Sequence, residues 1–594
     1  MAPKECGCHE NVYVPCRRLH HHEAGGQPIK VECMQTEFRA LAELCERLES
    51  TSKRTLMVDW VADFLGRLRV DEVEPATSMI LGRAFPKWDQ RVLEVSWATL
   101  SGIIKRLTSV DWKAFSDAFG KTGDIGAATK IVLEASRPRR QTTLFEKPLT
   151  ILEVRRGLEA IAETTGYGSR ERKERLIETL LSGATPLETK YLVKIMIGEM
   201  RTGFHEGLME LAVSRAFGIP QDVVQTASML TGDIGEVAMI AKAQGGEGVS
   251  RLQFQVFRPV KPMMAQTAED VNEALKEHGG ETALEYKLDG ARIQIHKSDD
   301  KVRIYSRRLT DITESLPEVV WLVRGEVKAH EVILEGEVIA VGEDGSPLLF
   351  QHLMRRFRRV HEIDMMIKQI PIELYLFDLI YLDGQSLITA SYLERRRKLA
   401  EIAGNIPLTR HMITTSPNEA ERFLMEAIDK GHEGLVAKKL DSPYTPGVRG
   451  KRWFKIKRTL EPLDLVIVAA EYGYGRRHDW LSDYYLAARD TQTGELLIIG
   501  KTFKGLTDEE IIQMTQRLKE SAIKEEHRRV TVIPGIVVEV AYNEIQKSPK
   551  YKSKMALRFA RITRIRDDKS PEEADTIQRV SEIYEKQFEK KAKY

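Results

Sequence analysis

The stretch Ala283–Lys297, with the sequence ALEYKLDGARIQIHK, contains a lysine two residues after a glutamate and just before a tight turn. Side chains alternate along an extended strand, so Glu285 and Lys287 share one face. Asp289 and Gly290 are typical of a turn that leads into a second strand. A lysine amine that has lost its proton is a nucleophile that forms covalent intermediates. The pattern therefore indicates either an ordinary solvated strand end or an amine directed at a substrate.

Carboxylates and cations follow in a defined order further along the chain. Glu335 and Glu337 share a strand face in LEGEVIA, and Glu433 lies in GHEGLVAKK. Lys455 and Lys457 share a face in RWFKIKR. Carboxylate oxygens are ligands that Mg²⁺ prefers, and cationic side chains are suited to holding phosphates. The cations in question are Arg292, Arg307, Arg449 and Lys455. Each residue alone is typical of a solvated strand, so the prediction depends on the ordered set.

That set resembles a known family. The strings KLDG, YSRR, LEGE, LFDLIYLDG, EGLVAKK, WFKIK and RIRDDK are similar to the motifs of covalent nucleotidyltransferases, and in detail to those of ATP-dependent DNA ligases of the archaeal type. The resemblance runs from about Met34 to Asp575. It implies a lysyl–AMP intermediate on Lys287, transfer of AMP to the 5′-phosphate at a nick, and displacement of AMP by the 3′-hydroxyl. It thus implies nick sealing in DNA replication, recombination and repair.

The resemblance also assigns roles to the other candidate residues. It implies that Glu285 contacts the adenine end of the nucleotide and that Phe377 stacks on the ring. It implies that phosphates and nucleotide are held by Arg292, Arg307, Glu337, Arg449 and Lys455, with Lys457 as a further candidate. Glu337 and Glu433 would bind Mg²⁺. Near the chain end, it implies that the departing pyrophosphate is oriented by Arg566, Asp568 and Lys569, through closure of a mobile C-terminal domain.

A lysine nucleophile must be deprotonated, and a free lysine has a pKa of about 10.4. Partial burial and the neighbouring cations Lys455 and Lys457 favour the neutral amine. We therefore expect the pKa of Lys287 to be lowered.

The elements that must position these residues change along the chain. Helical periodicity from Phe38 to about Ala243 gives way to short alternating strands from about Ala283 to Lys457. A further set of strands with one helix matches a small Greek-key barrel of the oligonucleotide-binding kind. We expect a multidomain α+β protein: an extension at 1–33, an all-helical DNA-binding domain at 34–245, an α+β adenylation domain with antiparallel sheets at 250–460, and an OB-fold β-barrel with a C-terminal helix at 461–594. The Gly-rich segment around Gly245 is the predicted first linker.

The helical part contains TGDIG twice, at Thr122–Gly126 and Thr231–Gly235, each before an apolar helical run. The repeat predicts two similar halves, and glycines before helix starts expose N–H groups that suit phosphates. The alternative is a pair of unremarkable helix starts. Other candidate DNA contacts are Met200–Leu208, Ser136–Gln141 and Arg355–Arg359, which would hold the sugar–phosphate backbone. The alternative for the last two is a solvated basic face.

Composition limits the remaining possibilities. The chain of 594 residues has a formal net charge of only +2, so DNA would be held by local patches and not by a global field. No apolar run reaches the roughly 18–20 residues that a membrane span needs, and no secretory signal is recognised. We expect a soluble, cytoplasmic monomer that binds nicked double-stranded DNA but no membrane, with a sliding clamp as a further candidate partner. CGC and LHHH in residues 1–33 are compatible with either zinc binding or a disordered extension.

Three other classes of protein share part of the pattern expected of a DNA ligase that uses ATP and Mg²⁺. An RNA ligase or RNA capping guanylyltransferase shares Lys-x-Asp-Gly but generally lacks a long helical domain ahead of the core. An NAD-dependent ligase carries a cysteine zinc finger after the core, and this chain has no cysteine beyond Cys45. A catalytically inactive DNA-binding protein would be free to lose Lys287, Glu337, Lys455 and Lys569, all of which are present.

Overall fold

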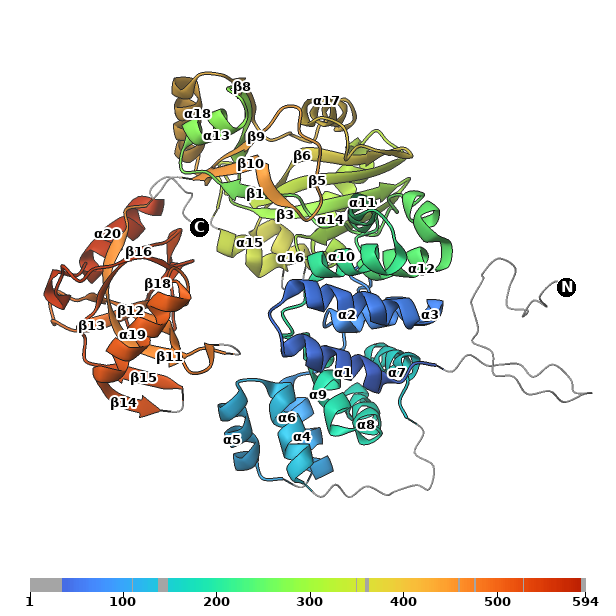
Figure 1. Cartoon of the computed structure of the whole chain (residues 1–594). Coiled ribbons are helices and arrows are strands. Elements are labelled where there is room, and N and C mark those ends of the chain that lie inside the picture. Colours follow the sequence, from blue (N-terminus) through green and yellow to red (C-terminus); the bar gives the residue numbers. More distant parts are fainter. Residues whose placement is uncertain are drawn as a thin grey trace, which may run out of the picture. The chain divides into compact units, whose positions relative to one another are not determined.

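The structure is a computed structural model, and it describes residues 35–108, 110–136, 148–348, 350–357, 363–457, 460–474, 477–526 and 528–588. The chain divides into two compact units. The first comprises Met1–Phe115 and Ile125–Gln253, and the second comprises Ser116–Asp124 and Phe254–Tyr594. Figure 1 shows the elements coloured along the chain, with helices from blue to green before the first sheet strands appear.

Every named element before Gln253 in the described residues is a helix, which confirms the predicted helical domain. The helices are α1 (Phe38–Glu49), α2 (Arg54–Arg67), α3 (Val70–Ile80), α4 (Trp97–Thr108), α5 (Trp112–Thr122), α6 (Ile125–Ala135), α7 (Ile151–Glu163), α8 (Ser169–Ser182), α9 (Pro186–Ile197), α10 (Glu206–Phe217), α11 (Gln221–Thr231) and α12 (Ile234–Ser250). Their apolar faces pack into one core that excludes water from leucine, isoleucine and valine side chains of most of these helices.

The two TGDIG copies build the same turn between consecutive helices. In each copy the threonine hydroxyl donates to the carbonyl four residues earlier, at 2.9 Å for Thr122 and 3.0 Å for Thr231. The following glycine has a left-handed backbone, with φ of +61° at Gly123 and +71° at Gly232. Asp233 then caps α12 by accepting a hydrogen bond of 2.9 Å from the first turn. The internal repeat is therefore present at the level of local structure.

The segment around Gly245 differs from the expected linker. It is helical, and α12 runs through it to Ser250 with a kink at Gly245, where φ is +66° and ψ is −160°. The turn after the kink buries Val249 against the core of the helices. This apolar residue keeps the glycine-rich segment folded, and the boundary between the two units falls later, at Gln253.

The first part of the second unit contains two five-stranded sheets. One sheet has the order β1-β10-β9-β2-β8 and the other has the order β4-β3-β5-β6-β7. All pairs are antiparallel except β1 with β10. The strands are β1 (Met264–Thr267), β2 (Thr282–Lys287), β3 (Ala291–Ser298), β4 (Lys301–Ser306), β5 (Glu331–Ala340), β6 (Ile372–Leu382), β7 (Gln385–Ser386), β8 (His411–Thr414), β9 (Gly434–Lys438) and β10 (Arg449–Lys457). The helices are α13 (Val271–Glu277), α14 (Pro317–Glu326), α15 (Phe350–Phe357), α16 (Ile363–Gln369), α17 (Tyr392–Ile402) and α18 (Pro417–Asp429), with a short η1 (Thr313–Ser315).

The turn after Lys287 joins the two sheets, because β2 belongs to one and β3 to the other. Gly290 lies where the chain crosses against β5. A Cβ atom at this position would lie 2.3 Å from the carbonyl oxygen of Val338, so no larger residue fits without movement of the backbone. Sterics thus explain the glycine of the Asp-Gly pair. The turn that contains this pair places Lys287 at the junction of the two sheets.

The rest of the second unit is rich in strands, as predicted. Its seven-stranded sheet has the order β13-β12-β11-β15-β14, with β16 pairing with both β11 and β19, and β17 pairs with β18 separately. Within the part of the chain that the structure describes, this pairing does not close into the expected barrel. The elements are β11 (Leu463–Tyr472), β12 (Leu481–Arg489), β13 (Leu496–Thr502), α19 (Asp508–Glu520), β14 (Ala522–Glu526), β15 (Arg529–Val532), β16 (Val537–Ala541), β17 (Glu544–Lys547), β18 (Met555–Arg558), β19 (Arg561–Ile565), η3 (Pro571–Glu573) and α20 (Ile577–Phe588).

No helix among the described residues combines the length and the apolar character that crossing a membrane would require.

Candidate active site

Three neighbouring strands bring the candidate nucleophile together with a carboxylate and a second lysine. Gly434 of β9 is the register partner of both Lys287 on β2 and Lys457 on β10. Glu433 precedes this glycine, and its Oε2 atom lies 2.8 Å from Nζ of Lys287. The same carboxylate is ion-paired with Lys457. One carboxylate thus bridges two lysines.

Gly434 permits this close approach. Its φ is +142°, and a Cβ atom there would lie 2.2 Å from the carbonyl oxygen of Ile456. We expect Gly434→Ala to force β9 and β10 apart, to cost roughly 2–4 kcal/mol of stability and to lower self-adenylation. Gly450→Ala on β10 is the matched control, since its Cβ would meet nothing within 4 Å. Thermal melting and adenylation of both variants check the prediction, which equal behaviour of the two would contradict.

The electrostatics of Lys287 are opposite to the expectation. Burial lowers the pKa of Lys287, but the carboxylates of Glu433, Glu337 and Asp289 outweigh it, and the pKa is raised. The expectation weighed the nearby cations and omitted Glu433, which the strand register places closest. The amine is therefore held as an ammonium ion and has to lose a proton before it can act as a nucleophile.

A second carboxylate belongs to this group. Glu337 lies on β5 opposite Arg292 on β3. Burial raises the pKa of Glu337 to about 7, against the attraction of Lys287 and Arg292, and the negative charge of Glu433 adds to the rise. Partial burial favours protonation of Glu433, yet Lys287 and Lys457 lower its pKa to about 2. The negative charge of Glu433 disfavours a second negative charge on Glu337, and a bound cation would relieve this repulsion.

The predicted phosphate-binding cations are concentrated in one place. Burial lowers the pKa of Lys455, and the positive charges of Lys457, Arg449, Lys287 and Arg307 lower it further. Such mutual repulsion destabilises the cations unless an anion lies among them. The arrangement is therefore suited to a group with several negative charges, such as a polyphosphate.

Arg292, also predicted to hold phosphate, is engaged elsewhere. Its Nε atom donates to Glu335 at 2.7 Å, and Nη1 donates to the carbonyl oxygen of Met263 at 2.6 Å. Its guanidinium lies 5.2 Å from the ring centre of Phe377. The structure thus places Arg292 under the ring of the predicted stacking residue.

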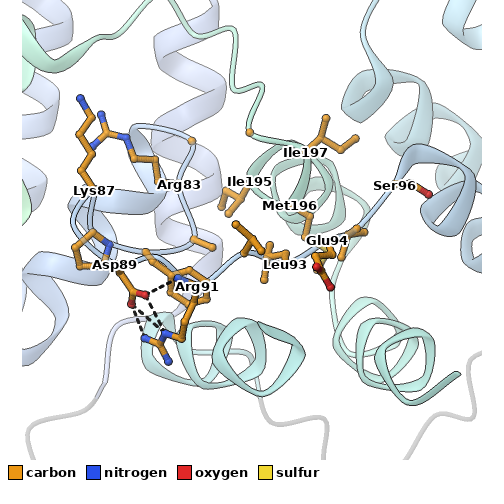
Figure 2. Close-up of a pocket in the computed structure, with 17 residues that line it drawn as sticks. Arg83, Lys87, Asp89, Arg91, Leu93, Glu94, Ser96, Ile195, Met196 and Ile197 are labelled. Atoms are coloured by element: carbon orange, nitrogen blue, oxygen red, sulfur yellow. Dashed lines mark hydrogen bonds and ion pairs between the residues drawn. The ribbon is translucent and has the colours of Figure 1, made fainter. Parts of the chain in front are cut away.

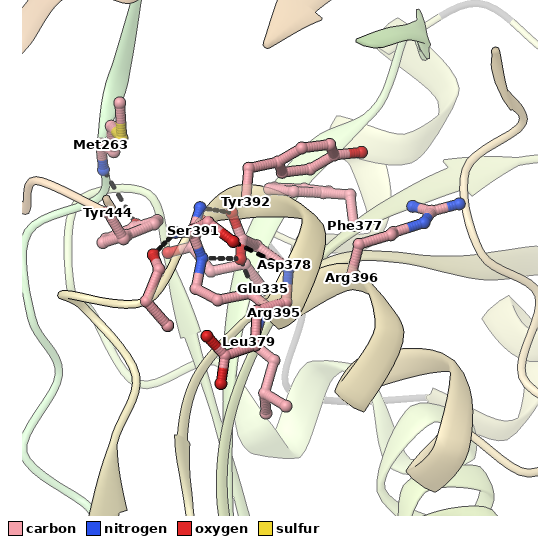
Figure 3. Close-up of polar contacts among 12 residues, drawn as sticks. Met263, Glu335, Phe377, Asp378, Leu379, Ser391, Tyr392, Arg395, Arg396 and Tyr444 are labelled. Carbon is pink, nitrogen blue, oxygen red and sulfur yellow. Dashed lines mark hydrogen bonds and ion pairs between the residues drawn. The ribbon is translucent and has the colours of Figure 1, made fainter. Parts of the chain in front are cut away.

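Glu285 lies in a buried polar network. It is 2% exposed, and its Oε1 atom accepts hydrogen bonds from Tyr392 at 2.5 Å and Arg396 at 3.3 Å. Its Oε2 atom lies 2.9 Å from Nζ of Lys438. Figure 3 shows Phe377, Tyr392 and Arg396 of this region. Both carboxylate oxygens of Glu285 are therefore occupied by neighbouring side chains.

Lys438 is a site residue that the sequence reasoning missed. It is 1% exposed, and its Nζ atom donates to the carbonyl oxygen of Phe377 at 3.1 Å. Three aromatic rings surround the ammonium, with centres at 4.4 Å for Trp453 and 4.9 Å for Phe377 and Tyr392. The sequence feature that could have pointed to Lys438 is a lysine at the end of the otherwise apolar strand GLVAK. Without the strand register, nothing in the sequence connects it to Glu285.

A buried ion pair lies next to this network and holds two of its elements together. Arg395 on α17 donates to Asp378 on β6, with Nε 2.7 Å from Oδ1, and both side chains are 0% exposed. Figure 3 shows the pair between the helix and the strand. The pair ties α17, which carries Tyr392 and Arg396, to the strand that carries Phe377.

In the C-terminal part, the residues of RIRDDK lie together. Nη2 of Arg566 is 2.7 Å from Oδ2 of Asp568, and Nζ of Lys569 is 2.6 Å from Oδ2 of Asp464 on β11. Arg566 is also paired with Asp464, at 3.1 Å. Arg566, Asp568 and Lys569 therefore form one connected set of ion pairs with Asp464.

The first unit has a cleft of about 550 Å³ beside α9, lined by the segment Gly82–Ser96. Figure 2 shows Arg83 and Lys87 pointing the same way, apart from the Asp89–Arg91 pair. Arg83 and Lys87 both pair with Glu206, at 3.0 and 2.9 Å. Because Glu206 offsets part of the charge of these two cations and Asp89 is paired with Arg91, the positive charge that the cleft offers to phosphates is reduced.

Other predicted contacts are placed in part. Asp233 of the second TGDIG is 1% exposed and accepts a hydrogen bond of 3.0 Å from the backbone of Lys87, so its side chain is structural. In Met200–Leu208, Arg201 is paired with Glu199 at 2.6 Å. The cysteine- and histidine-containing residues 1–33, most of Ser136–Gln141 and the end of Arg355–Arg359 lie outside the described residues.

Comparison with known proteins gives the same order of domains. Three family models match: the DNA ligase N terminus at residues 37–213, the ATP dependent DNA ligase domain at 262–457 and the ATP dependent DNA ligase C terminal region at 477–569. A solved structure titled Pmar-Lig_PreS3 matches with a TM-score of 0.54 and 17% identity, over 89% of this chain and 99% of that one, and shows the likeness of fold.

Two relatives extend the match to nearly the full length. A protein named DNA ligase 1 from Korarchaeum cryptofilum is 51% identical over 559 residues, which cover 93% of this chain and 99% of the relative. A protein named DNA ligase from Thermococcus fumicolans is 45% identical over 560 residues, covering 94% and 100%. The resemblance drawn from the motifs is confirmed, and the chain belongs to the ATP-dependent DNA ligase family.

Proposed function

We propose that the chain seals nicks in duplex DNA through an adenylate carried on Lys287. The observation that supports this most is the convergence of Lys287, Glu433 and Lys457 around Gly434, next to a cluster of cations. Nζ of Lys287 attacks the α-phosphorus of ATP, a P–N bond forms, and pyrophosphate leaves. The 5′-phosphate at the nick then attacks the same phosphorus, and Lys287 leaves. Finally the 3′-hydroxyl attacks the activated 5′-phosphorus, and AMP leaves as the phosphodiester forms.

Under this proposal the cations Lys455, Lys457, Arg449 and Arg307 hold the phosphates of ATP. A polyanion among them would offset their mutual repulsion, which lowers the pKa of Lys455. The same cations surround Lys287, so they favour its loss of a proton once Glu433 is drawn to another partner. Binding of the nucleotide and activation of the nucleophile are thereby linked.

Glu337 and Glu433 have carboxylate oxygens that are suited to binding Mg²⁺. Glu337 is half-buried and repelled by Glu433, and a divalent cation held by these carboxylates would offset that repulsion. Across the described residues, no group of three or more His, Cys, Asp or Glu side chains is placed to hold a metal ion. Two carboxylates with phosphate oxygens as the remaining ligands are typical of Mg²⁺. When bound there, the ion would neutralise charge on the reacting phosphate.

For the base, we propose that Phe377 stacks on the adenine and that Glu285 shapes the pocket. Phe377 is 8% exposed, and the cations of Arg292 and Lys438 lie 5.2 and 4.9 Å from its ring centre. Both oxygens of Glu285 are engaged by Tyr392, Arg396 and Lys438, so this carboxylate fixes the position of its neighbours.

Nicked duplex DNA is the proposed partner, bound in part by the helical unit. We expect the chain without its first 253 residues to keep ATP-dependent self-adenylation but to bind nicked duplex roughly 10²-fold more weakly, since one of the linked binding modules is lost. The cut follows Gln253, because a cut near Gly245 would divide α12. Filter binding measures the affinity of the full-length and truncated chains for nicked duplex, and nucleotide labelling measures their self-adenylation. Loss of self-adenylation would show that the catalytic part depends on the helical unit.

The test of the function is incubation with labelled ATP, GTP or NAD, followed by denaturing electrophoresis. The proposal predicts a labelled chain with ATP alone, which then seals a nicked duplex. Label from GTP would favour RNA capping, and label from NAD would favour the NAD-dependent class. A monomer is the expected assembly and a sliding clamp a candidate partner, both accessible to light scattering.

A further inference from the structure

Asp464 is ion-paired with Arg566 and Lys569, the two motif cations that the family resemblance assigns to the departing pyrophosphate; the inference below rests on the proposed function. Its Oδ2 atom lies 2.6 Å from Nζ of Lys569, and Oδ1 and Oδ2 accept from Nη1 of Arg566 at 3.2 and 3.1 Å. The side chains of Asp464 and Arg566 are 13% and 15% exposed, and that of Lys569 is 30% exposed. The carboxylate is thus largely shielded from water and saturated by cations.

The backbone around Asp464 is fixed as well. Its N–H donates to Oδ2 of Asp575 at 2.8 Å, and its carbonyl oxygen accepts from the N–H of Asp575 at 2.8 Å. Asp464 is the second residue of β11, which pairs with β16. The carboxylate therefore cannot follow the two cations if they move, and any movement of Lys569 toward another anion has to break the ion pair.

Arg566 and Lys569 differ in what they keep when Asp464 is lost. Arg566 has further carboxylates in Asp568, at 2.7 Å, and Glu539, at 3.8 Å. Lys569 has its ion pair with Asp464. Lys569 is therefore the cation on which Asp464 acts most strongly.

We propose that Asp464 is a positioning residue that restrains Lys569, and to a lesser degree Arg566, by competing with the polyphosphate of ATP for these cations. A carboxylate at 2.6 Å cancels most of the charge that a lysine presents to another anion. Self-adenylation, in which the P–N bond to Lys287 forms and pyrophosphate leaves, has to transfer Lys569 from Asp464 to the phosphates. Sealing of a nick that is already adenylated involves no pyrophosphate, so it does not require this exchange.

The test uses the full-length chain with Asp464→Asn, which keeps the shape and removes the charge. We expect the apparent KM for ATP in single-turnover self-adenylation to fall about fivefold, the scale of a partly exposed ion pair. The sealing rate on a pre-adenylated nick should stay within about twofold, because no cation changes partner there. Asp464→Glu, which restores the carboxylate, should return the KM toward that of the wild type.

Two further variants separate the restraint from a merely structural role. Asp567→Asn removes a carboxylate from the same motif whose partner is Arg517, at 2.8 Å, and should leave the KM unchanged. In a Lys569→Ala background, Asp464→Asn should give no gain. An unchanged or higher KM in Asp464→Asn, the same gain in Asp567→Asn, or a gain that persists without Lys569 would each overturn the proposal. Failure of the wild-type chain to become labelled by ATP would instead contradict the proposed function.

Discussion

Lys287→Ala is expected to abolish sealing that starts from ATP, by on the order of 10⁴-fold or more, because the variant lacks the atom that forms the P–N bond. The same variant should still seal a nick that already carries the adenylate, since the 3′-hydroxyl then displaces AMP without a lysine adduct. Lys287→Arg should behave like the alanine variant, because a guanidinium keeps its proton at neutral pH. Gel assays with ATP and with pre-adenylated substrate measure the two steps separately.

Lys451→Ala is the matched control for this loss. Lys451 lies on β10 in the same sheet, but it is exposed and paired with Glu277 at 2.9 Å. It should retain adenylation. Adenylation of the Lys287→Ala chain at wild-type rates would exclude Lys287 as the nucleophile, whatever the state of the rest of the site.

Lys569→Ala is expected to slow self-adenylation by roughly 10²-fold, the scale of one lost charge-stabilising contact at a reacting phosphate. Sealing of a pre-adenylated nick should change far less, because pyrophosphate takes no part in it. The comparison requires single-turnover conditions in both assays, since product release would mask the difference. Lys569→Arg should recover part of the rate, because the charge is kept.

Lys552→Ala controls for the loss of a lysine from the same domain. Lys552 is exposed and paired with Glu495 at 2.5 Å, on the hairpin between β17 and β18. It should leave self-adenylation near the wild-type rate. An equal loss of both steps in Lys569→Ala would count against a role confined to pyrophosphate.

Local sequence patterns predicted the helical and strand-rich parts of the chain and suggested which charged residues could form the site. Alternation placed Glu285 and Lys287 on one strand, and the TGDIG repeat predicted two similar turns that the structure contains. These features depend on sterics and hydrogen bonds between residues that are close together in the sequence, so a local pattern is enough to predict them. The helical structure of the glycine-rich segment at Gly245 could not be predicted from its composition, because the burial of Val249 depends on helices far away in the chain.

The electrostatics of the site could not be predicted, because they depend on strand register. The rise in the pKa of Lys287 comes chiefly from Glu433, which β9 places beside β2. A shift of the register by one residue would turn Glu433 away and leave the lysine among cations. Lys438 was missed for the same reason, since its contacts with Glu285 and Phe377 come from three different strands.

The most direct measurement of the central claim is mass spectrometry of peptides from the full-length chain after incubation with ATP and Mg²⁺. The account predicts one adenylyl group per chain, attached through nitrogen to Lys287, and its loss when nicked DNA is added. An adduct on another residue, or none on a chain that seals nicks, would contradict it.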